Sequence, residues 1–193
     1  SCGLQGRNAN YARDSKRIWL DSKEIHHGEY VWKMKKAGDV ISSAEKVSSL
    51  GYDTSDWLSA IVPGTVLNSL VYNKEYPEPY YGVNNKLESG KIPDISKVGR
   101  EFYTYWFRTE FDVPESFAGK TIWLQPDGVN YRAEIWVNGN LLSTLNGMFI
   151  SDYINVTDFV KVGRKNILAV KVYPVDVPGT TMPKSWGATG EFH

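Results

Sequence analysis

The sequence has little of what cross-links small domains or anchors them in membranes. Its single cysteine, Cys2, rules out an intrachain disulfide. No apolar run is long enough to cross a bilayer as a helix. The 22 basic and 22 acidic residues balance to a formal net charge of zero. Nucleic-acid and anionic-membrane partners are therefore not expected, because both select for a basic surface.

Several signatures of cofactor and metal chemistry are also missing. There are three histidines. Two of them, His26 and His27, are adjacent and would point to opposite faces of a strand, and His193 ends the sequence. We therefore expect no metal site. A glycine-rich phosphate loop and a Gly-x-Ser-x-Gly nucleophile turn are both absent, so no cofactor is expected either.

The hydrophobic fraction of 41% in 193 residues is enough for one domain with a sizeable core. Aromatic residues are abundant at 13%, with 7 tryptophans and 12 tyrosines. Such residues suit the half-buried surfaces of β-strands. Their flat rings also suit stacking on sugars, and composition alone does not choose between these two uses.

The clearest local pattern lies at residues 127–139, which read DGVNYRAEIWVNG. One strand face would carry Tyr131, Ala133, Ile135 and Val137, and the other Arg132, Glu134 and Trp136. The segment ends in Asn138-Gly139, a pair typical of two-residue hairpin turns because both positions need positive φ. Leu141-Leu142 then begins a returning strand. The pattern predicts an antiparallel hairpin.

The rest of the chain repeats this pattern. Further strands are expected at residues 17–20, 30–35, 102–113, 121–124, 149–156 and 166–173. In the last of these, one face would carry Ile167, Ala169, Lys171 and Tyr173 and the other Leu168, Val170 and Val172. We expect 102–113 to be the longest strand and Trp19 to lie in the core. A helical turn is expected within 43–50, and Thr65 is a plausible cap for a short helix after it. Together these features predict an all-β sandwich with one or two short helices.

Four segments carry a family resemblance. They are 62–66 (VPGTV), 76–84 (YPEPYYGVN), 127–139 and 163–170 (GRKNILAV). In this order they resemble the amino-terminal domain of glycoside hydrolase family 2, in its β-mannosidase and exo-β-glucosaminidase branch. The resemblance implies a jelly-roll, galactose-binding-domain-like sandwich. It also implies a non-catalytic domain that supports a catalytic barrel, with carbohydrate as the ligand and the remaining domains of the same polypeptide as partners.

Residues 73–95 form the best candidate for a ligand-facing loop, since long loops in compact domains are often functional. Tyr80, Tyr81, Asn84 and Asn85 combine stacking faces with amide donors and acceptors. The resemblance implies that a segment like this one approaches the sugar pocket and that Asn84 contacts the sugar. The alternative is structural: the tyrosines pack the loop and the asparagines satisfy its turns.

Catalysis is not expected from this chain alone. Retaining glycosidases need two carboxyl groups about 5 to 5.5 Å apart. The resemblance places both on a (β/α)8 barrel, and the sequence shows no strand–helix alternation for one. No catalytic residue is assigned. The parent enzyme would be a retaining exo-glycosidase of the β-mannosidase, exo-β-glucosaminidase or β-galactosidase kind. The alternatives are a free-standing carbohydrate-binding module on a bacterial surface and a structural domain without glycan affinity.

The expected organisation is a flexible tail at 1–16, the sandwich at 17–173, and a linker or truncated domain end at 174–193. Ser1-Cys2-Gly3 resembles the residues around a bacterial lipoprotein cleavage site. Cys2 would then carry a lipid and hold the protein in the periplasm or at the outer-membrane surface. The alternative is an ordinary terminal cysteine.

Overall fold

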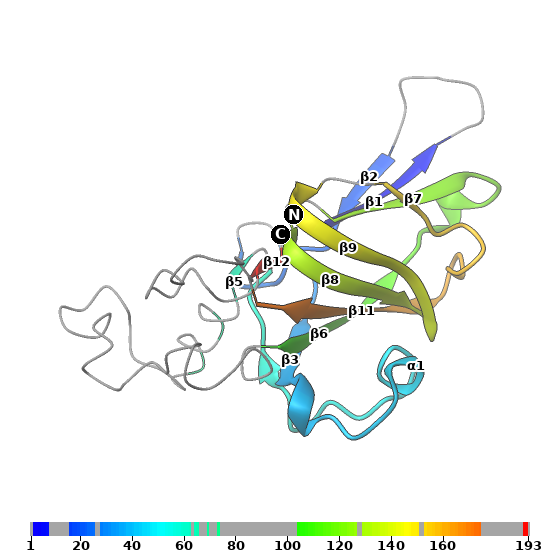
Figure 1. Cartoon of the computed structure of the whole chain (residues 1–193). Helices are drawn as coiled ribbons and strands as arrows, with labels where there is room; N and C mark the ends of the chain where they lie inside the picture. Colours follow the sequence, from blue (N-terminus) through cyan, green and yellow to red (C-terminus); the bar gives the residue numbers. More distant parts are fainter. Residues whose placement is uncertain are drawn as a thin grey trace, which may run out of the picture.

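The protein is a sandwich of two antiparallel β-sheets (Figure 1). The computed structural model describes residues 2–7, 16–25, 28–62, 64–65, 69, 73, 104–126, 129–150, 153–174 and 191–192. Within these residues the helices are single short turns, and none is long and apolar enough to cross a membrane. They are α1 (Ala44–Val47) and the 3-10 turns η1 (Ala37–Asp39) and η5 (Glu115–Phe117).

The smaller sheet has four strands in the order β10-β7-β1-β2. They are β1 (Cys2–Arg7), β2 (Lys16–Trp19), β7 (Thr121–Pro126) and β10 (Ile154–Asn155). The larger sheet runs β4-β3-β6-β11-β8-β12-β5, and β9 pairs with β8. Its strands are β3 (Trp32–Lys36), β4 (Leu58–Ser59), β5 (Gly64–Thr65), β6 (Tyr105–Asp112), β8 (Val129–Val137), β9 (Asn140–Ile150), β11 (Lys165–Tyr173) and β12 (Glu191–Phe192). The all-β prediction is confirmed.

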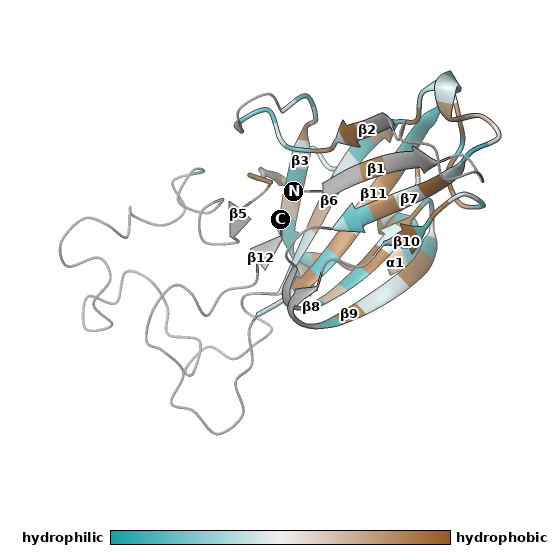
Figure 2. Ribbon diagram, turned by 90° about the horizontal axis from the view of Figure 1, so that it is seen from above, coloured by the Kyte–Doolittle hydropathy of each residue, from teal (hydrophilic) through white to brown (hydrophobic). Residues whose placement is uncertain are grey.

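The main core fills the space between the sheets. Hydrophobic residues occupy the middle of β11, and hydrophilic residues lie on either side of them (Figure 2). The larger sheet contributes inward side chains that include Phe107, Phe111, Ala133, Ile135, Val137, Leu168, Val170 and Val172. The smaller sheet contributes Leu4, Ile122 and Leu124. The predicted face assignments are confirmed for residues 132–137 and 167–173.

The outer face of the larger sheet carries a second, smaller core. Residues 37–57 cross this face, on the side away from β1 and β7 (Figure 1). Their buried hydrophobic residues are Val47 and Trp57, which pack with Trp106, Trp136 and Ala169 of the sheet. This explains why β6 and β11 are buried on both faces over much of their length.

Arg108 holds this covering segment in place. Its side chain projects from β6 and the residue is only 3% exposed. The guanidinium donates from Nε to the Val47 carbonyl at 2.9 Å and from Nη2 to the Ser49 carbonyl at 3.0 Å. Burial lowers the pKa of Arg108, and the nearby negative charge of Glu110 acts in the opposite direction. Carbonyls at the end of the α1 turn, which have no helical partner, thus receive charged donors.

The hairpin at Asn138-Gly139 forms as predicted. The φ angles are 48° at Asn138 and 84° at Gly139, both in the left-handed region. The Asn138 amide also donates to the Phe159 carbonyl at 2.7 Å and to Oδ1 of Asn166 at 2.8 Å, while its Oδ1 accepts from the Ile167 N–H at 2.9 Å. The fully buried Asn166 therefore links the hairpin turn to the start of β11.

One prediction about the chain ends is corrected, and the other is narrowed. Residues 2–7 do not belong to a tail, because β1 pairs with β7 and with β2. Its one strongly apolar residue, Leu4, is fully buried, and a single such residue produces no visible alternation. Residues 174–193 were expected to be a linker or a truncated domain end, and within them β12 pairs with β5 and with Asn130 of β8, as in the second alternative.

Three local predictions also need correction. Trp19 is 45% exposed, because its neighbours Ile18 and Leu20 take the inward positions of a period-two strand. Strand β9, with 11 residues, is longer than β6, with 8. The strand expected at 149–156 is divided between the end of β9 and β10. Thr65 pairs with Glu191 in a strand, and most of the helix expected after it lies outside the described residues.

Substitutions at Asn138 should separate its two roles. Asn138→Gly keeps the backbone angle but removes the side-chain bonds, and we expect a loss of about 1–3 kcal/mol in the free energy of unfolding. Asn138→Ala should lose roughly 1 kcal/mol more, because it also strains the left-handed position. Urea unfolding measures both values. Asn146→Ala, an exposed site on β9, is the control. Equal losses for Gly and Ala would contradict the strain argument.

Substitutions at Arg108 should release the covering segment. Arg108→Met leaves the Val47 and Ser49 carbonyls without their donors, and we expect a loss of about 2–4 kcal/mol in the free energy of unfolding. Arg108→Lys should fall between Met and wild type, because an ammonium cannot reproduce the fork of the guanidinium. The exposed Arg164→Met should change stability by less than about 0.5 kcal/mol. Unfolding monitored by tryptophan fluorescence also reports on Trp57 of the segment and on Trp106 of the sheet beneath it.

Candidate functional site

The outer face of the larger sheet brings charged and aromatic side chains into register across several strands. One row across the strands consists of Glu134, Lys171, Trp106 and Lys35, each directly opposite the next. The next row is Trp136, Ala169, Arg108 and Lys33. At the far end Lys165 lies opposite Asp112. Residues remote in sequence therefore share one surface, and pairs directly opposite each other interact.

One end of this face carries the Tyr173 cluster, which consists of Trp106, Arg132, Glu134, Lys171 and Tyr173. The Tyr173 hydroxyl donates to Glu134 Oε1 at 2.7 Å. The Arg132 guanidinium carbon lies 4.6 Å from the centre of the Tyr173 ring. The Lys171 ammonium lies 5.4 Å from that ring and 5.7 Å from the Trp106 ring. Both distances fit cation–π contacts.

The cluster sets the protonation of Tyr173. Burial, together with the hydrogen bond to Glu134 and the negative charge of Glu134, raises the pKa of Tyr173 from 10.0 to about 12, while Arg132 acts in the opposite sense. Tyr173 is therefore a neutral hydrogen-bond donor at physiological pH. The remaining Glu134 oxygen accepts from Trp136 Nε1 at 3.3 Å, so this carboxylate is engaged on both oxygens.

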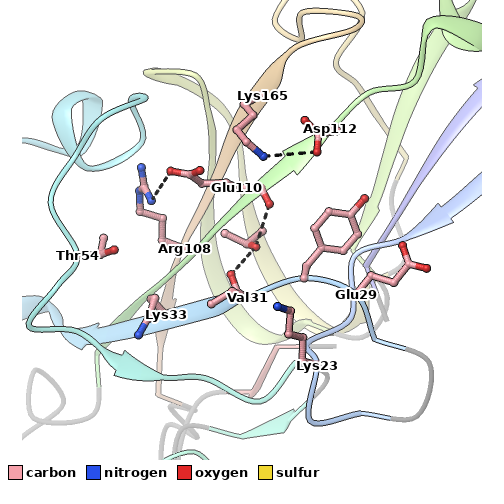
Figure 3. A pocket seen from close by; sticks show the side chains of 11 residues that line it. Lys23, Glu29, Val31, Lys33, Thr54, Arg108, Glu110, Asp112 and Lys165 are labelled. Carbon is pink, nitrogen blue, oxygen red and sulfur yellow. Dashed lines mark hydrogen bonds and ion pairs between the residues drawn. The ribbon is translucent and has the colours of Figure 1, made fainter.

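A polar pocket of about 390 Å³ opens on the same face, over β3, β6 and β11 (Figure 3). Its lining is mostly charged: Lys23, Glu29, Lys33, Arg108, Glu110, Asp112 and Lys165, with Tyr30, Val31, Thr54 and Thr109. Arg108 lies 3.7 Å from Glu110, and Lys165 lies 3.5 Å from Asp112. Burial raises the pKa of Tyr30, with further contributions from Glu29 and Asp112.

The pocket does not have the chemistry of a glycosidase active site. The side chains of Glu110 and Asp112 are 43% and 64% exposed, and each faces a cation. A general acid normally needs a buried, apolar setting. Nor does any group of three His, Cys, Asp or Glu residues suited to a metal ion occur in the part of the chain that the structure describes.

The predicted sugar contacts, Tyr80, Tyr81, Asn84 and Asn85, lie outside the described residues. Both flanks of their segment are described and anchored. Asn73 accepts from the Ser59 N–H at 3.3 Å and donates to the Ser59 carbonyl at 2.7 Å. The Thr104 carbonyl accepts from the Ala37 N–H at 2.8 Å. Residues 74–103 thus leave from the edge strand β4 and return at the start of β6.

Cys2, the predicted lipidation site, is the first residue of β1 and lies opposite Pro126 of β7. A lipid on Cys2 would therefore be attached directly at the sandwich. The flexible tether expected between a lipid and the domain is not present at residues 2–7.

Sequence reasoning did not identify the Tyr173 cluster. The alternation of β8 placed Arg132 and Glu134 on one face, and that of β11 placed Lys171 and Tyr173 on one face. It did not show that these two faces adjoin. That information lies in the β8–β11 register, which pairs Arg132 with Tyr173 and Glu134 with Lys171.

The high pKa of Tyr173 should appear as a loss of stability in alkali. The unfolded chain ionises this tyrosine near pH 10 and the folded chain near pH 12. Stability from this group is therefore intact below pH 10 and falls as the pH rises from 10 through 12. Tyr173→Phe should remove that part of the slope, and Glu134→Gln should lower the pKa of Tyr173. Ultraviolet titration of tyrosinate in the three proteins measures the pKa of Tyr173, and urea unfolding over this pH range measures the slope. A titration unchanged in Tyr173→Phe would contradict the assignment.

Comparison with known proteins identifies the fold. The family model described as the glycosyl hydrolase 2 galactose-binding domain-like domain matches residues 32–182. The crystal structure of Amycolatopsis orientalis exo-chitosanase CsxA superposes with a TM-score of 0.63 at 28% sequence identity, covering 77% of this chain and 16% of that one. The sandwich is therefore a galactose-binding-like domain, as expected from the resemblance.

Two curated relatives agree with the predicted branch. A mannosylglycoprotein endo-beta-mannosidase from Lilium longiflorum is 40% identical over 140 residues, which are 72% of this chain and 14% of the relative. An exo-beta-D-glucosaminidase from Amycolatopsis orientalis is 29% identical over 149 residues, covering 76% of this chain and 13% of the enzyme. The chain thus spans about a seventh of the length of these relatives. Since the family model covers most of its length, the chain belongs to the galactose-binding-like amino-terminal domains of glycoside hydrolase family 2.

Proposed function

We propose that this domain works as the non-catalytic amino-terminal part of a retaining family 2 glycoside hydrolase. It supports the catalytic barrel and lends residues of segment 74–103 to the rim of the sugar pocket. The observation that carries this proposal is the anchoring of that segment at both ends. A loop can present side chains to a substrate only if its ends are held by a rigid scaffold.

The first anchor is an asparagine that completes a sheet edge. Asn73 offers Ser59 of β4 both an acceptor and a donor, so its amide replaces a neighbouring strand at this edge. It also donates to the Ser69 carbonyl at 2.6 Å. Ser69 in turn accepts from the Ile61 N–H at 2.9 Å. The segment therefore starts from a point with several hydrogen bonds to the sheet.

The second anchor leads into the sheet itself. Thr104 is 5% exposed and is followed by Tyr105, which pairs with Lys36 of β3 and Val172 of β11. Between the two anchors Asn84 supplies an amide and Tyr80 and Tyr81 supply rings. These are the groups that hydrogen-bond hydroxyls and stack on pyranose faces.

The substrate class follows from the relatives' names. A mannosidase and a glucosaminidase are among them. We propose a β-mannoside or β-glucosaminide for the parent enzyme of this domain. The nucleophile and the acid/base would come from the barrel, because the pocket carboxylates Glu110 and Asp112 are exposed and ion-paired.

The test uses the polypeptide that contains this domain together with its barrel. Asn84→Ala should reduce kcat/KM on p-nitrophenyl β-mannoside or β-glucosaminide roughly 10- to 100-fold, the effect of one lost polar contact in the transition state. Asn146→Ala is the matched control and should be neutral. The 193-residue chain alone should show no hydrolysis. An Asn84→Ala enzyme with wild-type kinetics would contradict the proposed role of segment 74–103 in the sugar pocket. Hydrolysis by the 193-residue chain alone would contradict the non-catalytic assignment.

A further inference from the structure

The polar pocket over β3, β6 and β11 plays no part in the function proposed above. We propose that it is a separate binding subsite for a uronic acid, a sugar unit that carries one carboxylate. The inference follows from the charges that line the pocket and from which of them are already neutralised.

Two of the pocket lysines face the cavity without a carboxylate partner. Lys165 pairs with Asp112, and Arg108 makes its ion pair with Glu110. Lys23 and Lys33 have no ion pair with any residue in the described ranges. In Figure 3 their ammonium groups stand along the wall opposite Glu110 and Asp112. An anion entering the pocket would therefore meet two ammonium groups that have no ion-pair partner among the described residues.

The sheet register adds a second reason for an anion at Lys33. Lys33 lies directly opposite Arg108 on the outer face. Like charges in this position destabilise a sheet. Arg108 cannot move away, because its guanidinium is held by the Val47 and Ser49 carbonyls. A bound carboxylate near Lys33 would relieve this repulsion.

The other wall limits which anion fits. Glu110 and Asp112 line it, and Glu29 lines the pocket near Lys23 (Figure 3). Three carboxylates would repel phosphate groups or a polyanion. They are at the same time strong acceptors for hydroxyl groups. The lining thus favours a ligand with one negative charge and several hydroxyl donors. A uronic acid has this combination, whereas a simple carboxylate lacks the hydroxyls and a neutral hexose lacks the charge.

The size and shape of the pocket agree with a sugar. Its volume of about 390 Å³ lies near the lower end of the range for small-ligand sites. The half-buried Tyr30 and the exposed Val31 add a partly apolar surface beside the charged groups. Thr54 and Thr109 also line the pocket, although the Thr109 hydroxyl already donates to the Val31 carbonyl at 2.7 Å.

The test is a calorimetric titration of the 193-residue chain at constant ionic strength. The ligands are sodium D-glucuronate, sodium D-galacturonate, D-glucose and sodium acetate. We expect at least one uronate to bind at least about fivefold more tightly than glucose and than acetate, the effect of about one charge-assisted hydrogen bond. Equal affinities for uronate and acetate would show that the pocket binds any carboxylate and would overturn the proposal. Equal affinities for uronate and glucose would show that the charge of the ligand plays no part and would overturn it as well.

Variants locate the binding. Lys33→Gln and Lys23→Gln keep the length of the side chain but remove its charge, and each should weaken uronate binding at least about fivefold. Lys46→Gln, an exposed lysine on α1 outside the pocket, is the matched control. Thermal unfolding confirms that all variants are folded. Unchanged affinity in both pocket variants would overturn the proposal. The result is independent of the glycosidase assay, because it involves neither Asn84 nor a barrel.

Discussion

The buried guanidinium of Arg108 is the interaction on which the outer half of this domain depends. A charge at 3% exposure is tolerated only when its donors are satisfied. Here they meet the carbonyls of Val47 and Ser49. The arrangement also satisfies the end of a helical turn too short to be stable alone. Because the turn is held there, Trp57, Trp106 and Trp136 form a second core instead of an exposed aromatic patch.

The same segment is joined to the hairpin. The Gly139 N–H donates to the Ser48 carbonyl at 3.1 Å, between the two carbonyls that Arg108 binds. On its other side the hairpin is tied to β11 through Asn138 and Asn166. Three parts of the chain that are remote in sequence therefore share one network of buried polar groups. A break at Arg108 or Asn138 leaves donors or acceptors unsatisfied, and this explains why each should cost more than a surface substitution.

Local features of the fold were predictable and non-local ones were not. The Asn138-Gly139 turn and the faces of β8 and β11 depend on neighbours in sequence, and they were predicted correctly. Strand β1 was missed because only Leu4 marks its inner face. The Tyr173 cluster and the polar pocket were missed for another reason: both are assembled by the register of β3, β6, β8 and β11, which no local pattern contains. The roles of Tyr80, Tyr81, Asn84 and Asn85 remain predictions.

The outer face divides into three zones that differ in how their charges are satisfied. Beneath residues 37–57 the buried charge of Arg108 is bound by the Val47 and Ser49 carbonyls and by Glu110. In the Tyr173 cluster, Glu134 accepts on both oxygens and each cation has a ring. Both zones are internally complete and need no ligand to explain them. The pocket is different, because Lys23 and Lys33 make no ion pair within the described chain, whereas Glu110 and Asp112 are already paired. Folding alone gives no reason to place a lysine opposite a fixed arginine, and a negatively charged sugar would supply one.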